Sequence, residues 1–316
     1  MAYSGPLIEI DPPNITPWRK GNTGIEYVTS FDSGRPGPHV VLSALTHGNE
    51  ICGAIALDGM LNDRVRPVRG KLTFLFANVS AYLSFSRSDP AASRYLDEDL
   101  NRVWDESVLA GRRTSRELAR ARALRPVLDT ADLLLDIHSM TNESPPMMLT
   151  GMEPKHVAFA RRLGSPALLV RDEGHASGRR LRDYGRFGDS AAPAVALLIE
   201  CGQHWAKTSV DVAIETAWRF LAAADVLEES EAKRHLANPA PPQRCVLVTA
   251  RITIGSEDFR FTRNFVGLDV IPRAGTVIAY DAGKEIRTPY DDCVLIMPTR
   301  RLVRGQTAVR LGRFEA

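Results

Sequence analysis

Two histidines and two glutamates occupy positions at which a catalytic metal site can form. His47 and Glu50 stand three residues apart, directly after an apolar run, and His138 and Glu200 each stand at the end of another apolar run. Two histidines and one carboxylate around an open fourth position are the donors that hold catalytic zinc, and a further glutamate nearby is its usual general base. These residues therefore predict a zinc hydrolase.

The pair His47 and Glu50 also has a simpler interpretation. Asn49 could cap an ordinary helix, and Glu50 could complement the dipole of its first turn. The metal site is favoured because His138 accompanies the pair and because Gly48 gives the freedom that a sharp turn from strand to helix needs. The five remaining histidines are interpreted as structural or solvent-exposed: His39, His156, His175, His204 and His235.

Asp136 lies two residues before His138, so both side chains point to the same face if this segment is a strand. A buried carboxylate at that position is costly unless it is paired. Asp136 is therefore a candidate either to orient His138 or to bind a nearby cation, and the sequence leaves both alternatives open.

Composition predicts an ordinary globular protein without a polymeric or membrane partner. The 316 residues suffice for one large domain, or for a large domain with a small one. Charged residues make up 25%, and the formal net charge of +2 indicates neither nucleic acid nor a membrane surface. No apolar run approaches the roughly 20 residues that span a bilayer, and residues 1–6 do not resemble a signal peptide. A homo-oligomer is compatible with this composition.

The four cysteines predict reduced thiols in the cytoplasm. They are widely separated, each lies among apolar residues, and no CxxC pair is present. A structural zinc site made of cysteines is therefore not expected.

Strand and helix patterns alternate along the first three quarters of the chain. Strands are predicted at 25–31, 40–46, 71–77, 133–138, 147–151, 167–171 and 195–200, and helices at 51–61, 112–128, 155–163 and 210–227. The apolar strands linked by helices predict an α/β fold with a mixed, mostly parallel sheet between helices. Ligands of such sheets bind where strands end, which is where the candidate residues stand.

The pattern changes near residue 238. Three prolines within 238–242 exclude helix and interior strand, so this segment is predicted to be a linker. Short strands predicted at 245–254, 276–280, 294–297 and 308–311 form a small β domain, which divides the chain into 1–237 and 238–316. Tyr280 and Tyr290 of this domain are candidates to cover the site.

Four short motifs carry a resemblance to a known family. They are His47-Gly48-Asn49-Glu50, Asp99-Leu100-Asn101-Arg102, Asp136-Ile137-His138-Ser139 and Ile199-Glu200-Cys201-Gly202. In this order they resemble the succinylglutamate desuccinylase/aspartoacylase family, whose members share the fold of the zinc carboxypeptidases. The similarity covers about residues 25–230, and a trailing β domain also suits the family.

This resemblance implies one zinc ion per chain, bound by His47, Glu50 and His138, with Glu200 as the base and Arg94 as the group that polarises the substrate carbonyl. The residue types fit the hydrolysis of an amide. Zinc lowers the pKa of its water to about 7, and a carboxylate can take the proton and return it to the leaving amine. A guanidinium beside the metal stabilises the oxyanion.

The resemblance also implies that Asn101 and Arg102 bind the carboxylate of the substrate's amino-acid part. A guanidinium binds a carboxylate through two parallel hydrogen bonds, which suits this role. The alternative is that Asn101 caps a helix and that Arg102 forms a surface ion pair with Asp97 or Glu98.

A basic segment between Arg171 and Arg186 is a candidate to bind the acyl group. It holds five arginines and three glycines just before the predicted strand that ends at Glu200. It could reach a second carboxylate, as on a succinyl or aspartyl group, or it could be a solvated helix. Arg186 is the preferred acyl-binding residue because it stands closest to that strand.

Three functions are compatible with these residues. The first is a zinc amidohydrolase that removes a small acyl group from an N-acyl amino acid. The second is a metallocarboxypeptidase that cuts the C-terminal residue of a peptide, and the third is a binding protein that has lost catalysis. A pocket covered by the C-terminal β domain would favour the first, because it would admit only small substrates.

Overall fold

A computed structural model describes residues 5–174, 177–236 and 239–315 of the protein. Within these residues, eleven strands form one mixed sheet in the order β1-β3-β2-β4-β7-β5-β6-β8-β14-β13-β10. The strands are β1 (Val28–Asp32), β2 (His39–Ala44), β3 (Lys71–Phe76), β4 (Leu133–Met140), β5 (Met147–Leu149), β6 (Leu168–Arg171), β7 (Val195–Gln203), β8 (Arg244–Thr253), β10 (Asp269–Ile271), β13 (Cys293–Ile296) and β14 (Thr307–Phe314).

The centre of the sheet is parallel. Strand β2 lies between β3 and β4, β7 lies beside β4, and all three pairings are parallel. Every residue of β2 and β7 is buried, which explains why these segments are apolar throughout instead of alternating. The predicted α/β fold with a mixed, mostly parallel sheet is confirmed.

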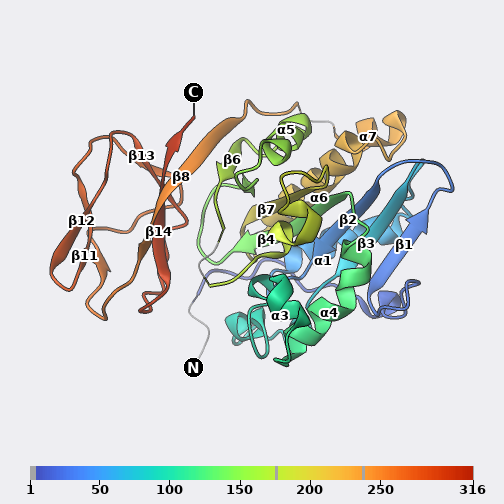
Figure 1. Cartoon of the computed structure of the whole chain (residues 1–316), viewed down its shortest axis with the longest axis horizontal. Helices are drawn as coiled ribbons and strands as arrows, with labels where there is room; N and C mark the ends of the chain where they lie inside the picture. Colours follow the sequence, from blue (N-terminus) through green and yellow to red (C-terminus); the bar gives the residue numbers. More distant parts are fainter. Residues whose placement is uncertain (1–4, 175–176, 237–238, 316) are drawn as a thin grey trace.

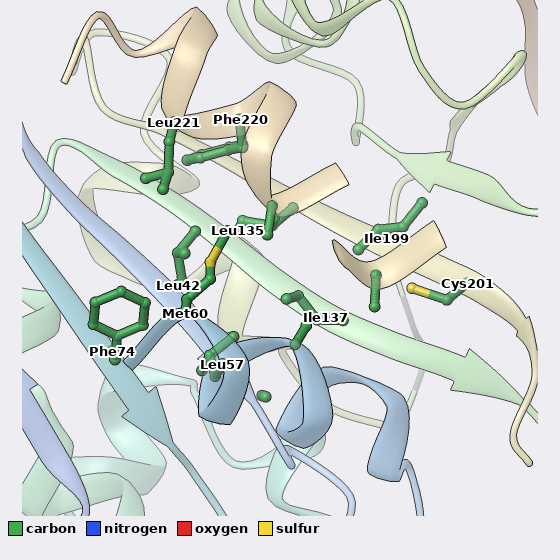
Figure 2. Packing of buried hydrophobic residues seen from close by; sticks show 14 of the residues in the cluster. Leu42, Leu57, Met60, Phe74, Leu135, Ile137, Ile199, Cys201, Phe220 and Leu221 are labelled. Carbon is green, nitrogen blue, oxygen red and sulfur yellow. The ribbon is translucent and has the colours of Figure 1, made fainter. Parts of the chain in front are cut away.

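Helices cover both faces of the sheet (Figure 1). Leu42 of β2 packs with the cluster of α1 (Ile51–Asn62), α5 (Pro154–Leu163) and α6 (Lys207–Ala223), while the neighbouring Val41 packs with the cluster of α3 (Glu106–Ala110) and α4 (Arg116–Leu128). Figure 2 shows the first cluster, in which Leu57 of α1 and Leu221 of α6 lie near Leu135 of β4. The remaining helices are short: η1 (Thr16–Trp18), α2 (Val79–Tyr82), η2 (Pro90–Arg94), η3 (Leu100–Arg102), η4 (Leu181–Asp183), η5 (Gly185–Phe187) and α7 (Glu229–His235).

The helix predicted at 112–128 begins later than expected. The side chain of Ser115 accepts a hydrogen bond from the backbone amide of Leu118 at 2.9 Å, so Ser115 caps α4, and residues 112–115 belong to no helix.

The C-terminal strands continue the central sheet. Strand β8 pairs in parallel with β6, and β14, β13 and β10 follow it with antiparallel pairings. A second sheet contains β9 (Arg260–Phe261), β11 (Val277–Asp281) and β12 (Lys284–Arg287). In Figure 1 these strands, coloured orange to red, lie at one end of the molecule. Because the sheet runs on from β6 to β8, the division into two domains at residues 237 and 238 stays a prediction.

Other expectations can be compared with the described residues. Residues 239–243 form neither helix nor strand, as the prolines predict, while Asn238 and His175 lie outside the described residues. All four cysteines are free and buried. None of the described helices has the length and apolar character needed to traverse a lipid bilayer.

Candidate metal centre and substrate cavity

The turn after β2 brings His47 and Glu50 together. The backbone amide of Glu50 donates to the carbonyl oxygen of His47 at 3.1 Å, and α1 begins at the next residue. As a result, Nδ1 of His47 lies 2.7 Å from Oε1 of Glu50, and both side chains are buried. The spacing of three residues therefore places an imidazole and a carboxylate side by side.

Gly48 is needed for a different reason from the one predicted. Its φ angle is not in the left-handed region, but a Cβ atom there would lie 2.4 Å from the carbonyl oxygen of Ser93 and from the backbone nitrogen of Tyr82. Gly48 also donates its amide proton to the carbonyl oxygen of Arg94 at 3.1 Å. Close approach of the segment before Arg94, rather than backbone freedom, excludes a side chain here.

The simple capping interpretation of this turn is wrong. Glu50 is the residue preceding α1 but makes no side-chain capping bond, and Oδ1 of Asn49 is buried without a hydrogen-bond partner among the described residues. Glu50 instead turns toward His47 and His138, which lie on different elements.

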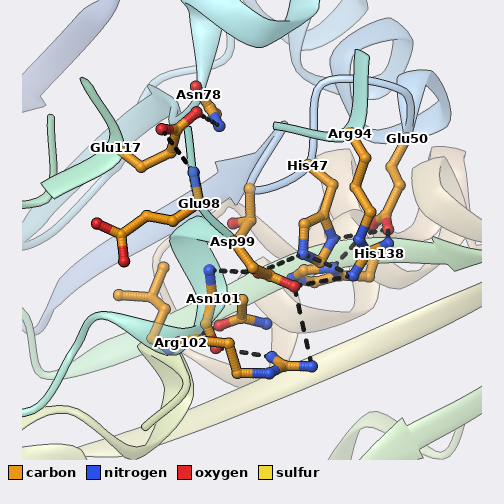
Figure 3. A network of polar contacts seen from close by, with 12 residues as sticks. His47, Glu50, Asn78, Arg94, Glu98, Asp99, Asn101, Arg102, Glu117 and His138 are labelled. Atoms are coloured by element: carbon orange, nitrogen blue, oxygen red, sulfur yellow. Dashed lines mark hydrogen bonds and ion pairs between the residues drawn. The ribbon is translucent and has the colours of Figure 1, made fainter. Parts of the chain in front are cut away.

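The parallel register of the sheet places His138 next to Glu200. The two residues are direct partners of β4 and β7, so their side chains lie on the same face. Nδ1 of His138 lies 2.8 Å from Oε2 of Glu50. One donor atom from each of His47, Glu50 and His138 lies within 4.8 Å of the others, and all three residues are buried (Figure 3).

Each of the two histidines has a second carboxylate at its other ring nitrogen. Nε2 of His138 lies 2.8 Å from Asp136, whose other oxygen accepts a hydrogen bond from the hydroxyl of Thr46 at 2.8 Å. Nε2 of His47 lies 2.9 Å from Asp99. Outer carboxylates of this kind fix the orientation of histidine ligands, so the orienting alternative fits Asp136 better than direct binding of a cation.

The electrostatics of this group fit a bound cation. Burial alone would raise the pKa of Glu50, but His47 and His138 outweigh it and hold this pKa well below its usual range. Burial lowers the pKa of His138, and the carboxylates of Asp136 and Glu50 outweigh that effect and raise it. Two imidazole nitrogens and a carboxylate oxygen, concentrated away from water, match the donors that hold Zn²⁺. The group could therefore hold a metal ion.

Glu200 lies beside His138 in the sheet and lines a cavity together with this group. Its Oε2 is buried and has no hydrogen-bond partner among the described residues. Burial, together with the negative charge of Glu50, raises the pKa of Glu200 to about 8. A buried carboxylate that is unpaired and near neutrality in pKa is suited to accept and return a proton.

Arg94 contacts the same group. Its guanidinium lies 2.9 Å from Nε2 of His47, 3.3 Å from Asp99 and 3.4 Å from Glu50. In Figure 3 the side chain of Arg94 lies between those of His47 and Glu50. A cationic donor thus lies beside the group that could hold a metal ion.

Asn101 and Arg102 reach the same cavity from η3. Asp99, not Asn101, caps this turn by accepting the amide proton of Asn101 at 2.8 Å. Oδ1 of Asn101 accepts the backbone amide of Leu181 at 2.8 Å, which leaves its Nδ2 to donate to a ligand. The alternative that Arg102 forms a surface ion pair with Asp97 or Glu98 is wrong. The carboxylate paired with Arg102 is that of Asp99, at 4.0 Å.

One cavity of about 250 Å³ connects these residues. His47, Glu50, His138, Glu200, Arg94, Asn101 and Arg102 all line it. The C-terminal strands and their loops contribute Phe265, Gly267, Met297, Pro298, Thr299, Arg300 and Arg310. Tyr280 and Tyr290 do not line it; the hydroxyl of Tyr290 instead bonds to Thr249. The cavity is therefore covered by the C-terminal part, but through residues that the sequence did not indicate.

Arg186 does not line the cavity, so the prediction that it binds the acyl group is wrong. Its exposed side chain forms an ion pair with Asp132 at 3.3 Å, directly before β4 begins. His138 lies six residues further along that strand, about 20 Å away at 3.3 Å per residue. Arg186 therefore lies at the opposite end of strand β4 from His138.

Arg180 is the residue of the basic segment that lines the cavity. Residues 179–181 run beside 101–104, since the carbonyl oxygen of Arg179 accepts the amide proton of Trp104 at 3.3 Å. Arg180 is 4% exposed and pairs with Asp183 at 2.8 Å and with Asp172 at 3.4 Å. Its Nη2 is buried and has no hydrogen-bond partner among the described residues.

Arg310 of β14 lies on the same wall. It shares Asp172 with Arg180, at 3.3 Å from its Nε. Burial, with the positive charges of Arg180 and Arg310 nearby, lowers the pKa of Arg102. The wall therefore carries more positive than negative charge, which favours an anionic ligand.

His204 also lines the cavity, although the sequence suggested an ordinary structural histidine. Its ring nitrogens lie 2.8 Å from the hydroxyl of Ser139 and 3.2 Å from that of Thr141. Burial lowers the pKa of His204 to about 4, so it is neutral near pH 7. Its position two residues after the end of the fourth motif gave no sign of this.

A family model matches more than half of the chain, which establishes the family. Residues 36–222 match the model of the succinylglutamate desuccinylase/aspartoacylase catalytic domain. The chain belongs to this family. It is 23% identical to a succinylglutamate desuccinylase of Pseudoalteromonas atlantica over 299 residues, which cover 85% of this chain and 79% of that protein.

Solved structures of the family share the fold. The succinylglutamate desuccinylase of Vibrio parahaemolyticus superposes with a TM-score of 0.65 at 18% identity, over 92% of this chain and 87% of that chain. The ectoine utilization protein EutE (DoeB) of Ruegeria pomeroyi superposes with a TM-score of 0.61 at 17% identity, over 92% of both chains. At these identities the likeness concerns the fold, and it extends over the C-terminal strands of this family member.

Proposed function

We propose that the protein is a zinc-dependent amidohydrolase that removes a small acyl group from an N-acyl amino acid. The observation that carries this proposal is the group of His47, Glu50 and His138, which shares one cavity with Glu200, whose Oε2 is buried without a hydrogen-bond partner among the described residues. Membership of a deacylase family supports the reaction class. The donor set supports zinc, because two imidazoles and a carboxylate leave an open position for a reactant.

Each residue around the metal position has its own role in the proposed reaction. Zinc, when bound, supplies a Lewis acid that polarises a carbonyl group and lowers the pKa of water. Glu200 accepts the proton of the attacking water and returns it to the leaving nitrogen. Arg94 donates hydrogen bonds to the oxygen on which negative charge develops.

The amino-acid part of the substrate binds at η3. Arg102 accommodates its carboxylate through two parallel hydrogen bonds, and Nδ2 of Asn101 donates beside it. Burial strengthens these contacts because few waters compete for the guanidinium. The free carboxylate next to the scissile amide is thereby the feature by which the site selects its substrates.

The covered cavity favours a small substrate over a peptide. Residues 297–300 and Gly267 line the same cavity as the residues of the proposed metal site. Asn142 donates to the carbonyl oxygen of Pro298 at 3.3 Å, and a Cβ atom on Gly267 would lie 2.3 Å from the hydroxyl of Ser144. These contacts connect the C-terminal part to residues 142–144, and a cavity of about 250 Å³ suits a small substrate, so a deacylase fits better than a carboxypeptidase.

The function can be tested with a panel of N-acetyl, N-formyl and N-succinyl amino acids. Release of the free amine is measured before and after removal of the metal by a chelator, and again after Zn²⁺ is restored. We expect one acyl class to be cleaved, with loss and recovery of activity that follow the metal. Activity that survives complete metal removal would contradict the mechanism, and cleavage of peptide C-termini alone would favour the carboxypeptidase.

A carboxylate on the acyl group is expected to bind Arg180. Replacement Arg180→Lys keeps the charge but removes the free Nη2 donor, and hydrogen bonds to charged groups contribute about 1.5–3 kcal/mol. We therefore expect KM for an N-succinyl substrate to rise about 10- to 100-fold, with a much smaller change for the N-acetyl analogue. Arg186→Ala is the matched control and should leave both values unchanged. Equal effects of Arg180→Lys on both substrates would exclude contact with the acyl group.

A further inference from the structure

A buried carboxylate behind the site, Glu117, contacts none of the groups that would react. It lies in the first turn of α4 and is 0% exposed. Three successive backbone amides donate to its oxygens: Leu96 at 2.7 Å, Asp97 at 3.1 Å and Glu98 at 3.3 Å. Nδ2 of Asn78 adds a fourth hydrogen bond at 3.2 Å (Figure 3).

These hydrogen bonds replace the cation that a buried carboxylate usually needs. None of the ion pairs among the described residues includes Glu117, so its charge is compensated by the amides of residues 96–98 and by Asn78. Successive amides that point into one concavity bind an anion well. A buried carboxylate without such partners would be strongly destabilising. Glu117 and the turn at 96–98 therefore stabilise each other.

The turn at 96–98 connects the residues of the functional site. Arg94 lies two residues before it and Asp99 directly after it, and both side chains lie 2.9 Å from Nε2 of His47. Arg102 follows in the next turn, where Asp99 accepts the amide proton of Asn101. A shift of the 96–98 turn would therefore move Arg94, the partner of His47 and the carboxylate-binding guanidinium together.

Side chains of the turn also accept hydrogen bonds from residues at the start of α4. Oδ2 of Asp97 accepts the backbone amide of Arg116 at 2.8 Å, and the hydroxyl of Ser115 bonds to Glu98. Helix α4 in turn packs into the core through Leu118 and other buried residues. The position of the turn is thus set by a helix whose own place is fixed by the sheet.

We propose that Glu117 is a positioning residue for the functional site. Its carboxylate holds the 96–98 turn, and through that turn it sets Arg94 and Arg102 against the proposed metal position and orients His47 by way of Asp99. This inference rests on the proposed function for its catalytic consequence. Its effect on the turn and on the metal-binding group is independent of the reaction.

The test compares Glu117→Gln with the unaltered protein. The amide of glutamine keeps one acceptor oxygen, and its NH₂ group faces a backbone donor. We expect faster hydrogen exchange of the amides at 96–98 in the metal-free protein and a Kd for Zn²⁺ that rises about tenfold. A displacement of about 1 Å in a reacting group can cost about 100-fold in rate, so kcat/KM should fall about 10- to 100-fold. Since both Arg94 and Arg102 would move, kcat should fall and KM should rise together.

Leu128→Ala is the matched control for stability. Leu128 is buried at the far end of the same helix, about 16 Å along the helix axis from Glu117 at 1.5 Å per residue, so its replacement weakens α4 without removing the carboxylate. If it reproduces the changes in amide exchange and zinc affinity, Glu117 has only a structural role and the proposal is overturned. Wild-type exchange, zinc affinity and kcat/KM in Glu117→Gln would overturn it as well.

The test also gives a result if Glu117→Gln fails to fold or if the proposed function is wrong. If Glu117→Gln does not fold, Glu117→Asp keeps the charge but withdraws it from the amides, and the same changes are expected with smaller size. If the unaltered protein cleaves no N-acyl amino acid, the proposed function fails. Zinc affinity and amide exchange would then still decide whether Glu117 holds the turn.

Discussion

Replacement of Glu200 by glutamine should abolish nearly all turnover while zinc remains bound. Glutamine has the same shape, but its amide cannot accept the proton of the attacking water. A positioned general base contributes about 100- to 10,000-fold, so we expect kcat to fall by that factor. The measurement is the rate of amine release together with the zinc content of the purified variant.

The position of Glu200 explains why no neighbour can take over. Glu200 lines the cavity and its buried Oε2 has no hydrogen-bond partner among the described residues, whereas Glu50 is engaged by both histidines. Glu143→Gln is the matched control, because Glu143 also lines the cavity but is exposed at its rim. A kcat within tenfold of the wild type in Glu200→Gln would exclude Glu200 as the base, and an equal loss in Glu143→Gln would indicate a general effect of charge.

The sequence predicted those parts of the site that depend on strand ends. Runs without polar residues predict strands buried on both faces, and the carboxyl ends of parallel strands meet at one edge of the sheet. His138 and Glu200 stand at such ends and are direct partners in the observed register. Likewise, a spacing of three residues across a turn is enough to predict that His47 and Glu50 meet. These relations are local or follow from a general rule of sheets.

The parts that were not predicted depend on contacts between distant segments. Arg180 and Arg186 differ by six residues, and only the pairing of 179–181 with 101–104 decides which of them reaches the cavity. Arg310 enters the cavity because β14 pairs with β8, which continues the sheet from β6. No pattern in the sequence indicates that register. Gly48 was recognised as necessary, but its reason, the close approach of Ser93 and Tyr82, also lies in the tertiary structure.

Replacement of Glu50 by glutamine should remove high-affinity metal binding. Glu50 supplies the negative charge between Nδ1 of His47 and Nδ1 of His138, at 2.7 and 2.8 Å, and a neutral amide cannot replace it. Loss of an outer-shell partner alone costs about 10- to 100-fold in metal affinity, so loss of a ligand should cost at least about 100-fold. Turnover at equimolar zinc should then be lost.

The decisive measurement is the stabilisation that zinc confers against unfolding. At a zinc concentration well above both dissociation constants, a 100-fold weaker site gives about 2.7 kcal/mol less stabilisation, because each tenfold change in Kd corresponds to about 1.4 kcal/mol. Glu200→Gln provides the comparison, since it alters a carboxylate of the same cavity and should keep the full zinc effect. If Glu50→Gln retains the wild-type stabilisation while Glu200→Gln loses it, the two glutamates have exchanged roles. The base would then have to be Glu50, which its two short contacts with histidine nitrogens argue against.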